Sequence, residues 1–129
     1  RRSPPPPRAR ARALLFWEHN RIGLCLPQLI EANAAPGARP GYGPGPKLTA
    51  ARPWLEDRYQ TDAAAFATLL GAGPFFHGAT PGIADCAIWG YAQWIERAGL
   101  APTAEIEAWR ARMRALPQMR SPAAFFAPR

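Results

Sequence analysis

Residues 78–95 have the sequence Gly-Ala-Thr-Pro-Gly-Ile-Ala-Asp-Cys-Ala-Ile-Trp-Gly-Tyr-Ala-Gln-Trp-Ile, which predicts a turn that leads directly into a helix. Pro81 and Gly82 are residues that interrupt regular structure. Asp85 follows shortly after Gly82, where a carboxylate can accept hydrogen bonds from the unpaired backbone N–H groups of the first helical turn. The helix itself is apolar on nearly every side, which is typical of a helix that is buried all round. We therefore expect a central buried helix over about residues 83–97, around which the other segments pack.

The charge of the chain is concentrated at its start. The chain has 129 residues, enough for one domain, and a formal net charge of +7. Five of the 16 basic residues lie in the first twelve positions, which contain no acidic residue. An arginine-rich start can bind nucleic acid, but this one lacks interleaved aromatic residues, so we expect a solvated linker and no nucleic-acid partner. No apolar run reaches the roughly 20 residues that a membrane-spanning helix needs, so we expect no membrane partner.

Cys25 and Cys86 are the only two cysteines, too few for a disulfide framework. Each lies in an apolar helical pattern, and we expect both to be buried, reduced thiols, as in a cytoplasmic protein. Together with His19 and His77 they lack the paired spacing of metal ligands, so no metal site is predicted. His77 is expected to bond a local backbone group, and His19 either to be solvated or to face a pocket.

Glycine and proline divide the first half of the chain into segments. Four prolines at positions 4–7 predict a Pro/Arg-rich linker over residues 1–7. A long helix is predicted over residues 8–33, with Pro27 kinking or breaking it near its C-terminal end. A loop rich in glycine and proline is expected over residues 34–48.

Two amphipathic helices are predicted in addition to the central one. The first runs from about Thr49 or Pro53 to Leu70. The second covers residues 103–116, and Thr103 is its expected N-cap. Both present apolar residues at helical spacing, so each is expected to pack one face against the core.

The expected fold is an all-α helical bundle of four to six helices. No alternating apolar pattern of the kind that predicts a strand is present. We divide the chain into the linker over residues 1–7, a helical domain over residues 8–120 and a tail over residues 121–129.

Three short stretches carry a resemblance to a known family. They are Phe-Trp-Glu at 16–18, Phe-Phe-His-Gly-Ala-Thr-Pro-Gly-Ile-Ala-Asp at 75–85, and Ile-Glu-Ala-Trp-Arg-Ala-Arg-Met-Arg-Ala-Leu-Pro at 106–117. In this order they resemble the C-terminal all-helical domain of the cytosolic glutathione transferase superfamily, and bacterial members in particular. The family usually has Ser or Thr in the place of Gly82, so the side-chain half of its capping box is missing here. Asp85 would supply the other half.

The resemblance implies a division of tasks between two domains. In this family an N-terminal thioredoxin-like domain binds glutathione and activates its thiol, so this chain alone is expected to contain no catalytic residue and to bind no cofactor. Glutathione would be the co-substrate where the N-terminal domain is present. The helical domain would form the dimer interface of a homodimer and the wall of the pocket for a small hydrophobic electrophile. By the same resemblance Trp17, Asn20, Arg21 and Leu24 would line that pocket, although core packing explains Trp17 equally well.

Two other functions are compatible with the same residues. The helical domain of this family also serves as a non-catalytic protein-interaction module attached to translation factors and synthetases. A solitary domain of this fold could instead bind hydrophobic ligands. A thioredoxin-like pattern upstream of the chain would favour the enzyme, whereas an unrelated domain there would favour the other two functions.

Overall fold

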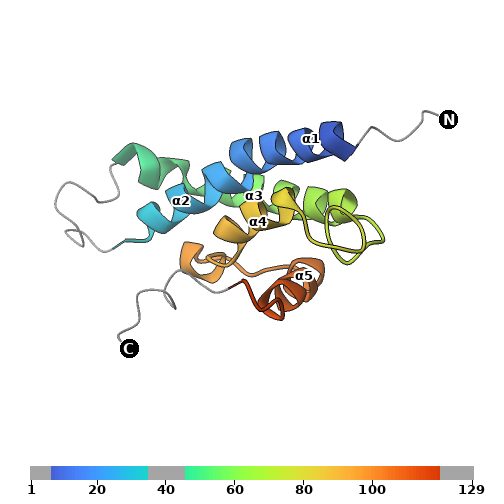
Figure 1. The fold of residues 1–129 in the computed structure, drawn as a ribbon. Helices are drawn as coiled ribbons and strands as arrows, with labels where there is room; N and C mark the ends of the chain where they lie inside the picture. Colours follow the sequence, from blue (N-terminus) through green and yellow to red (C-terminus); the bar gives the residue numbers. More distant parts are fainter. Residues whose placement is uncertain (1–6, 35–45, 120–129) are drawn as a thin grey trace.

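The computed structural model describes residues 7–34 and 46–119, and within these ranges the chain is helical and contains no β-strand (Figure 1). The elements in order are α1 (Pro7–Asn20), α2 (Ile22–Ala32), α3 (Pro46–Leu70), α4 (Ile83–Ala92), the short 3-10 helix η1 (Glu96–Ala98) and α5 (Ala104–Arg114). The predicted all-α fold is therefore confirmed. The linker expected over residues 1–7, except Pro7, and the tail expected over residues 121–129 lie outside the described residues.

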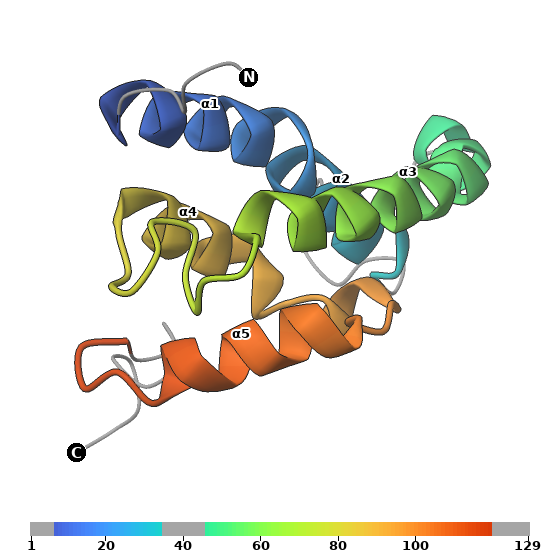
Figure 2. The ribbon, with the colours of Figure 1, turned by 90° about the vertical axis from the view of Figure 1, so that its right-hand side faces the viewer.

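Helix α4 lies in the middle of the bundle. It packs against α1 and α2 on one side and against α5 on the other (Figure 2). Helices α2 and α3 lie side by side and make the most extensive contact between any two elements. The core therefore forms where α2, α3, α4 and α5 meet.

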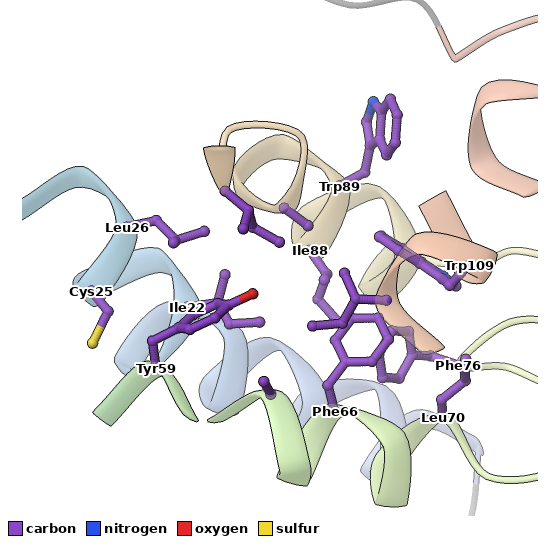
Figure 3. Close-up of a cluster of buried hydrophobic side chains, with 14 of the residues drawn as sticks. Ile22, Cys25, Leu26, Tyr59, Phe66, Leu70, Phe76, Ile88, Trp89 and Trp109 are labelled. Atoms are coloured by element: carbon purple, nitrogen blue, oxygen red, sulfur yellow. The ribbon is translucent and has the colours of Figure 1, made fainter. Parts of the chain in front are cut away.

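Aromatic side chains from distant parts of the sequence fill the centre of the core (Figure 3). Phe66 of α3, Phe76 of the loop before α4 and Trp109 of α5 are all buried and meet edge to face. The ring centroid of Phe66 lies 4.9 Å from that of Phe76 and 5.3 Å from that of Trp109. Such pairs add about 0.5–1.5 kcal/mol each beyond the burial of their area, so this cluster joins three elements firmly.

The helix predicted over residues 8–33 breaks at Arg21, so of the predicted kink or break at Pro27 the break is wrong. Arg21 has φ −122° and ψ −95°, which end α1, whereas Pro27 lies inside α2. Tertiary packing explains the position of the break. A Cβ atom on Gly23 would lie only 2.9 Å from Glu18 Oε1 and 3.2 Å from Tyr91 Cε2. The missing side chain of Gly23 thus lets the end of α1 and helix α4 approach the start of α2.

The boundaries of α3 and α5 depend on local sequence. Helix α3 begins at Pro46, earlier than the predicted start at Thr49 or Pro53, because a proline fits the first position of a helix. Pro53 is exposed, so water can hydrate the Thr49 carbonyl that its ring leaves without a partner. Helix α5 begins as predicted: the Thr103 hydroxyl accepts a hydrogen bond from the Ile106 N–H at 3.3 Å.

Helix α4 is buried on one face only, so the prediction of a helix buried all round is wrong. Ile83 is 61% exposed, and Cys86 and Gly90 are exposed as well. These positions are three and four residues apart, so they form one stripe on the surface of the helix. The prediction that Cys86 is buried is also wrong, whereas Cys25 is buried as expected. An apolar pattern alone does not show which face of a helix a neighbour covers.

The turn before α4 is tied to the core by Asp85, which is fully buried. Its Oδ2 atom accepts a hydrogen bond from the Gly82 N–H at 2.9 Å, so the carboxylate turns back onto the N-cap residue. Its Oδ1 atom accepts two more, from the Phe76 N–H and the Trp109 Nε1–H, both at 3.0 Å. One side chain therefore joins the start of α4 to the preceding loop and to α5.

Replacing Asp85 by alanine should destabilise the fold by roughly 3 kcal/mol or more, because three buried donors would lose a charged acceptor at once. Chemical denaturation of the two proteins measures this difference. The matched control is Glu105→Ala, since Glu105 is an acidic residue in the first turn of α5 that is exposed. Equal losses in the two variants would show that Asp85 contributes only through the helix dipole.

Candidate functional site

The outer surface of α1 carries a shallow hollow lined by Arg12, Leu15, Phe16 and His19. These positions recur at helical spacing, so they form one stripe along the helix. Phe16 is 70% exposed, which is unusual for so large an apolar side chain. The hollow therefore combines an apolar floor with two side chains that can carry positive charge.

The residues expected to line a pocket are not among those that line the hollow: Trp17 and Asn20 lie on α1, Arg21 at the helix break and Leu24 in α2. Trp17 is half-buried and packs against the core. The Asn20 side chain donates a hydrogen bond to the Phe16 carbonyl at 2.9 Å, within its own helix. Arg21 faces α3, where its Nη1 atom lies 3.6 Å from Asp62 Oδ1. Leu24 is exposed.

The expected residues and the hollow are therefore adjacent but distinct. The prediction of a pocket at Trp17, Asn20, Arg21 and Leu24 came from the family resemblance, in which this part of the first helix lines the pocket. The signal that identifies the hollow is the pair Leu15 and Phe16, two large apolar residues on the stripe that also holds Arg12 and His19. His19 is exposed and lines the hollow, so both roles considered for it are compatible with its position.

A small polar cluster lies at the break between α1 and α2. Asp62 of α3 is buried there, and burial raises the pKa of its carboxyl group against the opposing effect of Arg21 and Arg58. Arg58 donates a hydrogen bond to the Asn20 carbonyl at 2.6 Å. Cys25 belongs to the same cluster, and burial, with a smaller effect of Asp62, raises the pKa of its thiol. A buried thiol that holds its proton is not a nucleophile, so the cluster serves to fix the helix break.

Glu18 is a second buried carboxyl group, and it lies between α1, α2 and α4. Burial raises its pKa, and the neighbouring His19 acts in the opposite direction. Its Oε1 atom has no hydrogen-bond partner among the described residues. A charged carboxylate in this position is destabilising, because its lost hydration is not replaced.

Neither a metal centre nor a membrane-spanning segment is found in the part of the chain that the structure describes. No group of three or more His, Cys, Asp or Glu side chains in residues 7–34 and 46–119 is arranged to hold a metal ion. No helix in these ranges combines the length and the apolar character needed to cross a bilayer.

Replacing Glu18 by glutamine should raise the thermal midpoint of unfolding at neutral pH. The raised pKa means that the folded state binds the proton more tightly than the unfolded state, so the charged form weakens the fold above that pKa. The gain should shrink as the pH falls and the wild-type carboxyl becomes protonated. Thermal melts of both proteins across the acid range measure it, with the half-buried Glu56→Gln as the control. A gain that does not depend on pH would contradict this account.

Comparison with known proteins identifies the family. The model of the glutathione S-transferase C-terminal domain matches residues 27–117, which run from the middle of α2 to just beyond α5 and do not include α1. Neither a curated protein nor a solved structure gives a significant match to the chain. The family match covers most of the chain, and it includes the turn held by Asp85 and the central helix α4. The chain therefore belongs to the family of glutathione S-transferase C-terminal domains.

Proposed function

We propose that this chain is the helical half of a cytoplasmic glutathione transferase and that its first two helices form the wall of the pocket for a hydrophobic electrophile. A thioredoxin-like domain would hold glutathione and supply the group that activates its thiol. The thiolate would then attack the electrophile, and the bond to the leaving group would break as the thioether forms. The helical domain would contribute binding and exclusion of water, and it would also form the interface of a homodimer.

The observation that carries this proposal is the exposed apolar surface on two adjacent helices. Phe16 of α1 is 70% exposed and Leu24 of α2 is 39% exposed, and α1 and α2 pack against each other (Figures 1 and 2). Contiguous exposed apolar surface marks a site of interaction, and Leu15 and Phe16 lie together at the hollow on α1. In a transferase of this family such a surface would be covered by the glutathione-binding domain and by the bound substrate.

Residues of both α1 and α2 would form the wall of the pocket. Leu15 and Phe16 would form its apolar part, with Arg12 and His19 at its rim. Asn20 and Leu24 are exposed and would extend the same wall toward α2. Trp17 and Arg21 would act indirectly, since Trp17 packs on the core and Arg21 pairs with Asp62 of α3.

Replacing Phe16 by serine should weaken the binding of a fluorescent hydrophobic dye to the isolated chain by about tenfold or more, because a buried phenylalanine contributes about 1.5–3 kcal/mol. The matched control is Trp54→Ser, because Trp54 of α3 is 56% exposed but lies on another helix. Dye titrations measure both variants, and the fold should survive in each since both side chains are exposed. Equal losses in the two variants would contradict the assignment of the wall to α1.

Ligand binding by the isolated chain distinguishes the proposed role in a transferase from a role as a protein-interaction module. The isolated chain should bind an apolar electrophile such as 1-chloro-2,4-dinitrobenzene saturably, followed by tryptophan fluorescence, and Phe16→Ser should weaken that binding. It should neither bind glutathione nor accelerate the conjugation reaction. Conjugation by the chain alone would contradict the proposed division between domains. Failure to bind the electrophile would favour the non-catalytic protein-interaction module of the same fold.

A further inference from the structure

Helix α1 presents positive charge on its exposed side. It contains Arg8, Arg10 and Arg12, and all three side chains are exposed. Its single acidic residue, Glu18, is only 6% exposed and lies between α1, α2 and α4. No exposed carboxylate of the helix therefore offsets the three guanidinium groups, and the surface around the hollow attracts anions.

Arg12 is the arginine of this group that lines the hollow. Arg10 is engaged elsewhere, because it donates hydrogen bonds to two backbone carbonyls at 3.2 Å and 2.8 Å. All nine acidic residues of the chain lie in the described ranges, and the ion pairs formed there use Arg21, Arg110 and Arg114. None of the side-chain hydrogen bonds and ion pairs within residues 7–34 and 46–119 involves Arg12, so these residues leave its guanidinium available to a ligand.

The hollow places this cation beside an apolar floor. Arg12 lies three residues before Leu15 and four before Phe16, the two spacings that make side chains neighbours on a helix. Leu15 is half-buried and Phe16 is 70% exposed, so a ligand can lie on both side chains. His19 lies at the other end of the stripe, and its ring carries an N–H donor even when it is neutral. The hollow therefore fits a ligand with an apolar body and an anionic group at one end.

We propose that the electrophile bound by this chain carries a carboxylate and that Arg12 is the residue that selects it. This inference rests on the proposed function and adds to it the charge of the substrate. The planar guanidinium of Arg12 would donate two parallel hydrogen bonds to the carboxylate, while the apolar body lies on Leu15 and Phe16. Arg12 contributes to binding and orientation only, and no proton or electron passes through it.

The expected selectivity is modest, because the hollow is open to water. An ion pair at an exposed position contributes little, so Arg12 should favour a carboxylate over a neutral ligand of the same shape by about threefold to fivefold. Salt screens this attraction, since the Debye length falls from about 10 Å at 0.1 M ionic strength to about 3 Å at 1 M. The preference for the charged ligand should therefore weaken as the salt concentration rises.

The test uses two ligands that differ in charge and share one aromatic body, 3,5-dinitrobenzoate and 3,5-dinitrobenzamide. Both lack a leaving group, so neither can label a thiol such as the exposed Cys86. Titrations of the chain, followed by tryptophan fluorescence corrected for absorption by the ligand, give the two dissociation constants. At low salt the benzoate should bind about threefold to fivefold more tightly than the benzamide, and at about 1 M salt the two should bind nearly equally.

Three variants locate the preference. Arg12→Gln should weaken binding of the benzoate to the level of the benzamide and leave the benzamide nearly unaffected. Arg12→Lys should keep part of the preference, since the charge remains without the planar fork. The matched control is Arg97→Gln, because Arg97 is exposed on η1, outside the hollow, and its loss lowers the net charge equally. This control should keep the full preference, and the fold should survive in all three variants because both arginines are exposed.

The outcomes separate a failure of this inference from a failure of the proposed function. Equal binding of the two ligands, or a preference that survives Arg12→Gln, would leave the apolar wall in place and remove the role of Arg12. A loss of equal size in Arg97→Gln would assign the preference to net charge instead. Displacement of the benzoate by reduced glutathione, which carries carboxylates without an apolar body, would assign Arg12 to the co-substrate. If neither ligand binds, or if Phe16→Ser leaves both unaffected, the wall itself is wrong and this inference falls with it.

Discussion

The fold depends on one buried carboxylate. Asp85 accepts hydrogen bonds from the N-cap residue of α4, from the backbone of Phe76 and from the indole of Trp109. The two aromatic residues that it holds belong to the edge-to-face cluster with Phe66, so the polar contact fixes the geometry of the apolar one. A buried charge is tolerated only when its hydrogen bonds are complete. These three hydrogen bonds therefore tie the path of the chain into α4 both to the preceding loop and to α5.

Features encoded by nearby residues could be predicted from the sequence, and features set by contacts between helices could not. The helical class, the caps at Asp85 and Thr103 and the end of α3 at Gly71 follow from local residue types. The break at Arg21 could not be foreseen, because it depends on the approach of Glu18 and Tyr91 to Gly23. Sequence periodicity likewise described α4 as apolar without showing that its Cys86 side is exposed.

The position of the candidate site on α1 also depends on contacts between helices, which the sequence did not reveal. The resemblance directed attention to α1, and α1 does carry an exposed apolar hollow. It did not distinguish the stripe through Phe16 from the one through Trp17, because both are aromatic positions on one helix. The difference arises from α3, which draws Arg21 and the backbone of Asn20 toward Asp62 and Arg58 and leaves the opposite side of α1 to solvent.

A Cβ atom on Gly82 would lie 2.2 Å from His77 Cδ2, and the Ala84 N–H donates a hydrogen bond to His77 Nε2 at 3.3 Å. The His77 ring therefore occupies the space of an N-cap side chain, which restricts how this turn can change in evolution. A hydroxyl residue introduced at position 82 would collide with the imidazole, and loss of the histidine would leave the Ala84 N–H without an acceptor. Either single replacement should therefore lower the stability of this turn, whereas the two together would exchange one cap for another. Descendants of this sequence should therefore keep or exchange these two residues as a pair.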